Sequence, residues 1–301
     1  MARPLLSRSP ARNRSPGTTT AWRARLGLLL GGLLLVAGLG AAAAAPTPTT
    51  SATGDVRLFQ FNMCGRVCPW PAQVKTAAVV NALDEFHPAA VSLNEACRSE
   101  FSGIVTGVAG RGWKMSAAFM TTKNDGCDDG TDFGNAVLTR AEIDTVDQTF
   151  YRAQGQDNGE FRGLLCVTAD LGMRTTRICS THIVNSGPDP TGSIRRRQIA
   201  QAASVLGASG LPVVLMGDFN VPPGDRGLDG LYTAAHRGGS GQFDEVDQGP
   251  DKCRCGAVTQ RSGEKIDYVF VTAGDFDIVK SQATHAAYSD HASLRGWVDK
   301  K

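Results

Sequence analysis

The chain has 301 residues, of which 42% are hydrophobic and 20% are charged, and its formal net charge is +2. This is ordinary globular composition with enough apolar residues for a large core, and one folded domain is the simplest count. The charge balance excludes bulk electrostatics as a signal for nucleic-acid binding.

The first 45 residues form a separate segment in which six arginines precede an apolar run from Leu26 to Leu39, and alanines then meet Pro46. This order is typical of a secretory signal peptide over residues 1–45 with cleavage near Ala44. The run is also long enough to remain as an uncleaved anchor. Both interpretations predict a secreted or extracellular domain. The segment holds six of the 31 basic residues and no acidic one, which leaves 25 basic against 29 acidic residues, a formal charge of −4.

All eight cysteines follow this segment: Cys64, Cys68, Cys97, Cys127, Cys166, Cys179, Cys253 and Cys255. An even number outside the cell favours disulfides. If residues 164–183 form a hairpin that turns at Gly172 and Met173, Cys166 and Cys179 lie opposite each other, close enough to bridge. The alternative is a zinc site made from the first two and the last two cysteines, but their spacing is loose for zinc ligands.

Strands and helices alternate along the rest of the chain. After a Pro- and Thr-rich linker over residues 46–54, strands are predicted in residues 55–65, 89–96, 113–122, 133–140, 164–183 (the hairpin), 211–220, 265–272 and 289–298. One helix is predicted before Pro88 from the apolar face of Val79, Val80, Leu83 and Phe86. A second covers residues 194–206, with Ser193 as its N-cap and Gly207 beyond its end. Strands dominate, which predicts an α/β fold with two mixed, mostly antiparallel sheets.

Polar residues stand at six of the predicted strand ends: Asn62, Glu95, His182, Asp218 with Asn220, Asp267, and Asp290 with His291. Any one of them alone is an ordinary turn residue. Together they are the ligands and proton carriers that hold a hard cation and a phosphate, provided that these ends meet at one edge of the sheets.

The stretch "LMGDFNVPP" gives the local geometry of one such end. An extended backbone would place Asp218 and Asn220 on the same side and turn Phe219 toward the core. Gly217 leaves room for a close approach, and the two prolines that follow end the strand. The stretch therefore predicts two polar groups presented to a ligand.

Seven segments occur in the order found in the endonuclease/exonuclease/phosphatase superfamily: "FNMCG", "VSLNEA", "FGNAVLTR", "STHIVNS", "MGDFN", "KIDYVFV" and "SDH". The chain resembles this family, which includes deoxyribonucleases, abasic-site endonucleases, neutral sphingomyelinases and inositol-polyphosphate phosphatases, from Asp55 to Val298. The resemblance implies a four-layer α/β/β/α sandwich in a domain over residues 55–301.

The resemblance also implies a metal site. Glu95 would bind Mg²⁺, with Mn²⁺ or Ca²⁺ as alternatives, and Asp290 would be a further carboxylate on the metal side. Asn62, beside Glu95, would contact both metal and substrate. Asn94 stands where many family members have glutamine, a change expected to alter metal affinity more than chemistry.

The remaining residues would carry the chemistry. Asp218 resembles the group that orients or deprotonates the attacking water, and Asn220 resembles one that holds a phosphate oxygen. His291 would contact the phosphate, with Asp267 behind it to fix its tautomer, and His182 would be the second histidine. The candidates for an acidic partner of His182 are Asp128, Asp129 and Asp132.

Three further features carry two interpretations each. Arg98 either binds a substrate phosphate or stays a solvated charge. The arginines of residues 195–197 either form the polar outer face of a helix or contact nucleic acid. Trp70 either contacts substrate, by stacking on a base or facing lipid, or packs against its neighbouring prolines.

The sequence therefore predicts a secreted, monomeric, metal-dependent phosphodiesterase that cleaves DNA, with RNA as a further substrate and no dedicated protein partner. The alternatives keep the same site but act on sphingomyelin, another phospholipid, a phosphoinositide or a phosphomonoester. A binding module that has lost the chemistry is disfavoured because no expected catalytic residue is missing. A serine hydrolase is disfavoured because the chain has no G-x-S-x-G motif.

Overall fold

A computed structural model of the protein describes residues 56–155, 158–172 and 174–301. The predicted signal peptide of residues 1–45 and the predicted linker of residues 46–54 lie outside the described residues, as does Met173 of the predicted hairpin turn. Within the described ranges, no helix is both long enough and apolar enough to cross a lipid bilayer.

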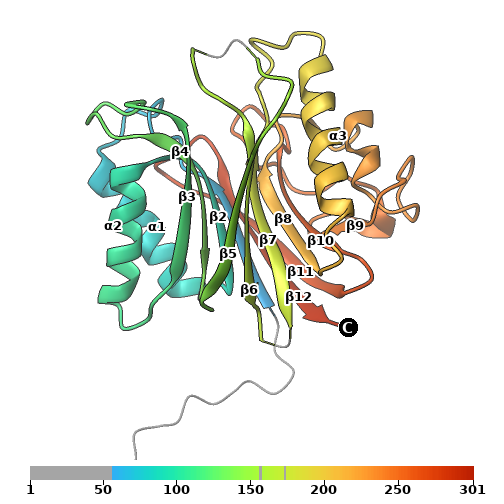
Figure 1. Ribbon diagram of the computed structural model, residues 1–301, viewed down its shortest axis with the longest axis horizontal. Coiled ribbons are helices and arrows are strands. Elements are labelled where there is room, and N and C mark those ends of the chain that lie inside the picture. The colour runs from blue at the N-terminus through green and yellow to red at the C-terminus, as the bar shows by residue number, and fades with distance from the viewer. Residues whose placement is uncertain (1–55, 156–157, 173) are drawn as a thin grey trace, which may run out of the picture. The chain divides into compact units, whose positions relative to one another are not determined.

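Two six-stranded sheets form the centre of the domain (Figure 1). The first contains, in spatial order, β11 (Phe276–His285), β12 (Ala292–Lys300), β1 (Val56–Asn62), β2 (Ala90–Cys97), β4 (Phe133–Thr139) and β3 (Ser116–Lys123). The second contains β5 (Ile143–Phe150), β6 (Gly163–Asp170), β7 (Thr175–His182), β8 (Val213–Asp218), β10 (Asp267–Thr272) and β9 (Phe243–Glu245). β1 runs parallel to β2 and β7 parallel to β8, while the other neighbours are antiparallel, so both sheets are mixed as predicted.

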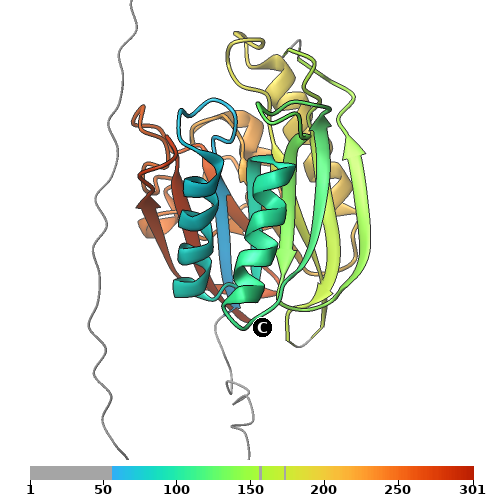
Figure 2. The same ribbon diagram turned by 90° about the vertical axis from the view of Figure 1, so that its left-hand side faces the viewer.

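Helices cover the outer face of each sheet (Figures 1 and 2). α1 (Ala72–Phe86) and α2 (Arg98–Gly110) pack on the first sheet, and α3 (Ser193–Gly207) with the short 3-10 helix η1 (Arg226–Gly230) packs on the second. A further 3-10 turn, η2 (Pro250–Lys252), lies in the long loop before β10.

Three buried apolar clusters separate these layers. One lies between the sheets and joins Leu58 and Val137 of the first sheet to Val214 and Val269 of the second. The other two lie between each sheet and its helices. The domain is therefore the predicted four-layer α/β/β/α sandwich, and an apolar interface holds the two sheets together.

Strand β1 shows how the sequence leads from this core to the polar edge. Leu58 faces the cluster between the sheets, whereas Phe59 and Phe61 face the helices. Because side chains alternate along a strand, Gln60 and Asn62 share the inner side with Leu58, and both are fully buried. Buried polar groups on this side require partners, which they find in the second sheet.

Helix α2 was not expected from the sequence, because it contains Gly103 and Gly107, and glycine costs about 1 kcal/mol in a helix interior. Both glycines face α1. A Cβ atom at Gly103 would lie 2.9 Å from Thr76 Cγ2, and one at Gly107 would lie 2.6 Å from Val80 Cγ2. The residues that weaken the helical pattern therefore let the two helices pack closely.

The start of α3 differs from the prediction that Ser193 is its N-cap. Ser193 is the first residue of the helix and makes no capping hydrogen bond. The carboxylate of Asp189 accepts hydrogen bonds from the N–H groups of Ile194 (3.1 Å) and Arg195 (2.9 Å) instead. A carboxylate has two oxygens and can satisfy two of the free N–H groups at a helix start. Gly207 is the last residue of the helix and does not lie beyond its end.

All eight cysteines form disulfides: Cys64–Cys68, Cys97–Cys127, Cys166–Cys179 and Cys253–Cys255. Cys166 and Cys179 lie opposite each other in the pairing of β6 with β7, which confirms the predicted bridge. The zinc alternative is wrong for this structure, because its four sulfur atoms are already used in disulfides.

Candidate active site

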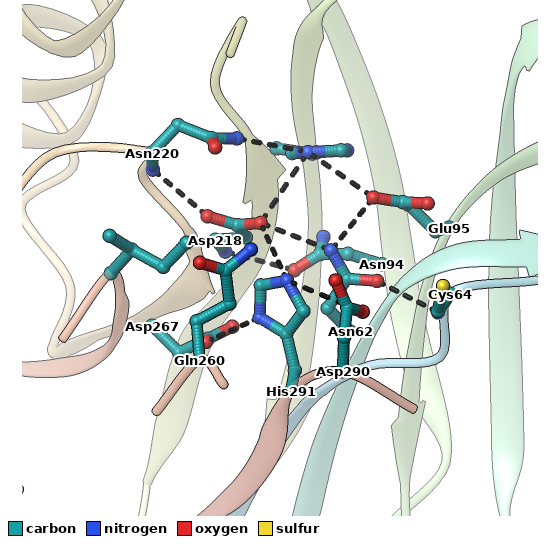
Figure 3. A network of polar contacts seen from close by, with 12 residues as sticks. Asn62, Cys64, Asn94, Glu95, Asp218, Asn220, Gln260, Asp267, Asp290 and His291 are labelled. Carbon is teal, nitrogen blue, oxygen red and sulfur yellow. Dashed lines mark hydrogen bonds and ion pairs between the residues drawn. The ribbon is translucent and has the colours of Figure 1, made fainter. Parts of the chain in front are cut away.

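The polar strand ends meet at one edge of the two sheets (Figure 3). Parallel pairing brings the carboxyl ends of β1 and β2 together, and likewise those of β7 and β8. Strands β12 and β10 run antiparallel to β1 and β8, so these two strands begin at the same edge. The structure thereby brings together Asn62, Glu95, His182, Asp218, Asn220, Asp267, Asp290 and His291.

The amide of Asn62 joins carboxylates from both sheets. Its Nδ2 donates to Glu95 Oε1 at 2.9 Å and to Asp218 Oδ2 at 3.0 Å, and its Oδ1 accepts the N–H of Cys64 at 2.9 Å. Asn62 therefore presents hydrogen-bond donors to the site and fixes the orientation of both carboxylates. Its predicted role as a metal ligand stays a prediction.

Glu95 has a left-handed backbone, with φ of 54°. The residue lies where the register of β2 against β4 shifts between Leu93 and Ala96. Gly65 covers this bend, since its N–H donates to the Glu95 carbonyl at 2.9 Å and a Cβ there would lie 2.1 Å from that oxygen. Such a conformation costs on the order of 1–3 kcal/mol. The bend turns the Glu95 side chain toward Asn62 and His182.

Gly217 lets strand β8 approach β7 closely, as the sequence predicted. A Cβ atom at this position would lie 2.0 Å from the carbonyl oxygen of Thr181. The next residue, Asp218, consequently lies opposite His182 in the strand pairing.

The turn after β8 differs from the extended geometry expected for it. Phe219 does point into the core, but Asn220 has a φ of 51° and its N–H donates to Asp218 Oδ1 at 2.9 Å. This short hydrogen-bonded turn is typical of Asp and Asn. The Asn220 side chain still reaches the site, where its Nδ2 donates to the Ile183 carbonyl (2.9 Å) and lies 3.2 Å from His182 Nε2.

His291 and Asp267 form a buried ion pair, with Nδ1 of the ring 2.8 Å from Asp267 Oδ2. Burial alone would lower the pKa of His291, but the charges of Asp267, Asp218 and Asp290 outweigh it and raise this pKa to about 10. Burial and the charge of Asp267 also raise the pKa of Asp218, against the pull of His291. His291 is therefore a cation at neutral pH, and Asp218 is a stronger base than an exposed aspartate.

His182 has a partner that the sequence reasoning missed. Its Nδ1 lies 2.6 Å from Nη1 of Arg162, which is itself 3.0 Å from Glu160 Oε1. The expected acidic candidates do not take this place: Asp132, for example, pairs with Arg98 at 3.6 Å. Burial, followed by the charge of Arg162, holds the pKa of His182 well below its usual range.

Two overlapping groups of side chains have the chemistry to hold a cation. In each, the potential ligand atoms lie within 4.8 Å of one another: Glu95, His182 and Asp218 in one, and Asp218, Asp267 and His291 in the other. Carboxylate oxygens suit a hard divalent ion that keeps several waters, so the two carboxylates of the first group, Glu95 and Asp218, suit Mg²⁺. Asp290 is half-exposed and lies near His291 and the Cys64–Cys68 loop, with its Oδ1 4.0 Å from His291 Nε2. Its predicted metal role stays a prediction.

The arginines take different places. Arg98 contacts Thr121 and Asp132 and covers the ring of Phe119, with no contact to the polar cluster among those described. Arg195 donates from Nη1 to the Asn220 carbonyl at 3.3 Å and so supports the turn that carries a site residue. The other two arginines of the predicted basic run bond to backbone carbonyls around the start of their own helix.

Asn94 ties the two sheets together beneath the site. Its Oδ1 accepts from Gln60 Nε2 at 2.8 Å and from the Asp218 N–H at 3.0 Å. Its Nδ2 donates to Asn135 Oδ1 at 2.9 Å and to the Thr181 carbonyl at 3.0 Å. The sequence marked Asn94 as a departure from the family, but only the second sheet reveals that it holds the backbone of Asp218.

Comparisons with known proteins agree with the fold. The model of the Endonuclease/Exonuclease/phosphatase family matches residues 59–291. A search of curated proteins finds no match.

Solved structures share the fold at low sequence identity. An endonuclease/exonuclease/phosphatase from Beutenbergia cavernae DSM 12333 is 19% identical, with a TM-score of 0.65, over 82% of this chain and 72% of that chain. The human Nocturnin catalytic domain with bound sulfate anion is 14% identical, with a TM-score of 0.63, over 82% and 94%. ANGEL2, a 2′,3′-cyclic phosphatase in complex with adenosine-2′,3′-vanadate, is 14% identical, with a TM-score of 0.59, over 82% and 96%. With the family model covering most of the domain, the chain belongs to the endonuclease/exonuclease/phosphatase family.

Proposed function

We propose that this phosphoesterase-family protein is a secreted, divalent-metal-dependent endonuclease that hydrolyses phosphodiester bonds in DNA, with RNA as a further substrate. The observation that carries the proposal is the Asn62 amide, which donates hydrogen bonds to Glu95 and Asp218 from different sheets. The ion pair of His291 with Asp267 lies beside them. Oxygen ligands and a cationic imidazole at one place are what hydrolysis of a phosphate ester requires.

Glu95 and Asp218 would hold the cation, with their oxygens oriented by Asn62. When bound, Mg²⁺ supplies charge neutralisation at a non-bridging phosphate oxygen. Mn²⁺ and Ca²⁺ also accept oxygen ligands and are the alternative cations.

Three residues of the chain would activate the water and bind the phosphate. Asp218 would orient the attacking water and accept its proton. His291 stays charged because of Asp267 and donates to a phosphate oxygen, a bond that strengthens as negative charge develops. Asn220 offers its amide to the same phosphate group.

The choice of nucleic acid rests on two supporting observations. One neighbouring structure carries an adenosine-2′,3′-vanadate, a nucleotide analogue. Trp70 is 44% exposed and makes an edge-to-face contact with Tyr288, at 5.6 Å between ring centroids, two residues before Asp290. An exposed aromatic ring next to a phosphate site can stack on a base.

Secretion is supported by the disulfides. All eight cysteines are paired, and such a set persists in oxidising compartments.

One panel tests the substrate. Plasmid DNA, RNA, sphingomyelin and a phosphoinositide are each incubated with the purified protein and Mg²⁺, and the products are separated. The proposal expects nicked and then fragmented DNA at the highest rate. Intact plasmid together with cleaved lipid would replace the nuclease by the phospholipase alternative on the same residues.

A further inference from the structure

Arg162 is a buried cation on the wall of the site. Its side chain is 2% exposed and immediately precedes β6. Nη1 lies between two partners, 3.0 Å from Glu160 Oε1 and 2.6 Å from Nδ1 of His182. The Glu160 oxygen is farther from the ring, at 3.9 Å, so the guanidinium is the group that contacts His182 directly.

Hydrogen-bond chemistry then determines where the ring carries its proton. A guanidinium only donates and has no acceptor, so Nδ1 of His182 must accept. An imidazolium, or a ring protonated on Nδ1, would place one N–H against another at 2.6 Å. The proton of the neutral ring therefore sits on Nε2.

This tautomer changes what Asn220 can do. One hydrogen of its Nδ2 goes to the Ile183 carbonyl, and the same nitrogen lies 3.2 Å from His182 Nε2. If Nε2 were an acceptor, it would accept a hydrogen bond from the second hydrogen of Asn220 Nδ2. Because Nε2 carries a proton, neither nitrogen can satisfy the other, and both donors stay available to an oxygen placed between them.

The surroundings favour an external acceptor. Nε2 of His182 lies 3.6 Å from Asp218 Oδ2 and 3.9 Å from Glu95 Oε1, beyond ordinary hydrogen-bond length. We propose that Arg162 is a positioning residue that fixes His182 as the Nε2–H tautomer and thereby makes His182 and Asn220 a pair of donors for one phosphate oxygen. The two histidines of the site are thus oriented oppositely, His182 by a cation and His291 by an anion.

The tautomer is measured without metal or substrate. In the ¹⁵N-labelled, metal-free protein, two-dimensional spectra that connect ring nitrogens to ring protons distinguish Nε2–H, Nδ1–H and imidazolium forms, and His182→Ala assigns the signals. The proposal expects Nε2–H with a hydrogen-bonded Nδ1 at pH 7. Arg162→Met should let the ring populate the Nδ1–H or imidazolium form, because Glu160 then remains near Nδ1, and Arg162→Lys, which keeps a donor, should restore the Nε2–H form. A Nδ1–H ring or an imidazolium in the wild type would overturn the proposal.

Glu160 is removed together with Arg162 to keep the fold intact. Arg162→Met alone removes the cation beside the partly buried Glu160 carboxylate, so the double variant Glu160→Gln with Arg162→Met repeats the measurement without that charge. Inorganic phosphate is the probe for the donor pair. Added phosphate should shift the His182 Nε2–H signal in the wild type and shift it less in the double variant, whereas equal shifts would contradict the paired donors.

The catalytic part of the inference rests on the proposed function and has its own readout. Removing one preorganised donor costs on the order of 100-fold in kcat. Arg162→Met should therefore lower kcat about 100-fold in the wild-type background. It should change kcat less than about twofold in a His182→Ala background, where the residue that it positions is absent. A full effect in both backgrounds would show that Arg162 acts independently of His182. The expected spectra in a protein that hydrolyses no phosphodiester would refute the proposed function and leave the tautomer intact.

Discussion

Asp218 and Asp267 lie directly opposite each other where β8 pairs with β10. His291 spans the two carboxylates, with Nδ1 2.8 Å from Asp267 Oδ2 and Nε2 3.8 Å from Asp218 Oδ2. Two buried carboxylates that face each other in this way repel, and the positive charge of the His291 ring between them offsets the repulsion. The pairing of β8 with β10 thereby influences the charges of His291 and Asp218, the two groups to which the proposed chemistry assigns roles.

Replacing Asp267 by asparagine tests this relationship. The wild-type pKa of about 10 keeps His291 cationic through neutral pH. In Asp267→Asn this pKa falls, so kcat should drop about 100-fold or more and should decline further as pH rises from 6 to 9. The pH profile of kcat for both proteins measures the effect. Asp277→Asn, which removes an exposed acid, is the control, and a profile of the Asp267 variant that follows the wild type would refute the assigned pair.

Asn94 should contribute to stability as well as to the site. In Asn94→Leu, Gln60, Asn135 and the N–H of Asp218 each lose a buried partner. A buried polar group without a partner costs about 1–3 kcal/mol. We expect the free energy of unfolding in urea to fall by about 3 kcal/mol or more. The exposed Asn124→Leu should be nearly neutral, and equal values for the two variants would show that Asn94 does not join the sheets.

Two disulfides should differ in what they support. Cys166–Cys179 closes a longer loop than Cys64–Cys68, at sequence separations of 13 and 4, and loop entropy makes its removal cost about 3 against about 2 kcal/mol. Replacing both members of the Cys166 pair by alanine should lower the melting temperature and leave kcat nearly unchanged.

Replacing Cys64 and Cys68 by serine should affect the site instead. The Cys64 N–H holds Asn62 Oδ1, and a misplaced site residue can cost roughly 10- to 100-fold in rate. Thermal unfolding and kcat measured on both double variants make the comparison. If kcat of the two double variants falls only in proportion to their loss of thermal stability, the Cys64 loop does not position Asn62.

Glu245 should make stability depend on pH. It shares Lys265 with Asp247, at 3.3 and 3.2 Å, and burial, opposed by Lys265, raises the pKa of Glu245 to about 7. A carboxyl whose folded pKa is raised stabilises the protein fully below its unfolded value, and this contribution is lost as pH rises through the folded value. The unfolding free energy of wild type relative to Glu245→Gln should therefore fall by about 3 kcal/mol between pH 4 and pH 8. The exposed Glu264→Gln should show no such trend, and a flat difference for the Glu245 variant would contradict the raised pKa.

The two mixed sheets and the polar strand ends can be predicted from periodicity, whereas the four-layer arrangement is what the family resemblance implies. Alternating apolar residues define the inner strands, and the polar residues that interrupt them, such as Asn62 and Asp218, mark the strand ends that meet. The edge strands β5 and β11 were not identified, because most of their residues are exposed and lack an apolar side.

The geometry of individual side chains was harder to predict. The left-handed backbones of Glu95 and Asn220 depend on neighbouring strands and on a local turn that no spacing shows. The partner of His182 is Arg162, 20 residues earlier and brought close by the pairing of β6 with β7. A search for acidic residues near the "DDGTD" loop could not find it, because the group in contact with the ring is the cation of Arg162.

The most direct test of the account is the metal dependence of DNA cleavage by the purified protein. Nicking of supercoiled plasmid is followed in Mg²⁺, in chelator, and after Mg²⁺ is returned in excess, for the wild type and for Glu95→Gln. Cleavage that stops with chelator and resumes with Mg²⁺ is the expected result, with Glu95→Gln requiring more Mg²⁺ to reach half of its maximal rate. Undiminished cleavage in chelator would contradict a site in which two sheets supply the ligands of one cation.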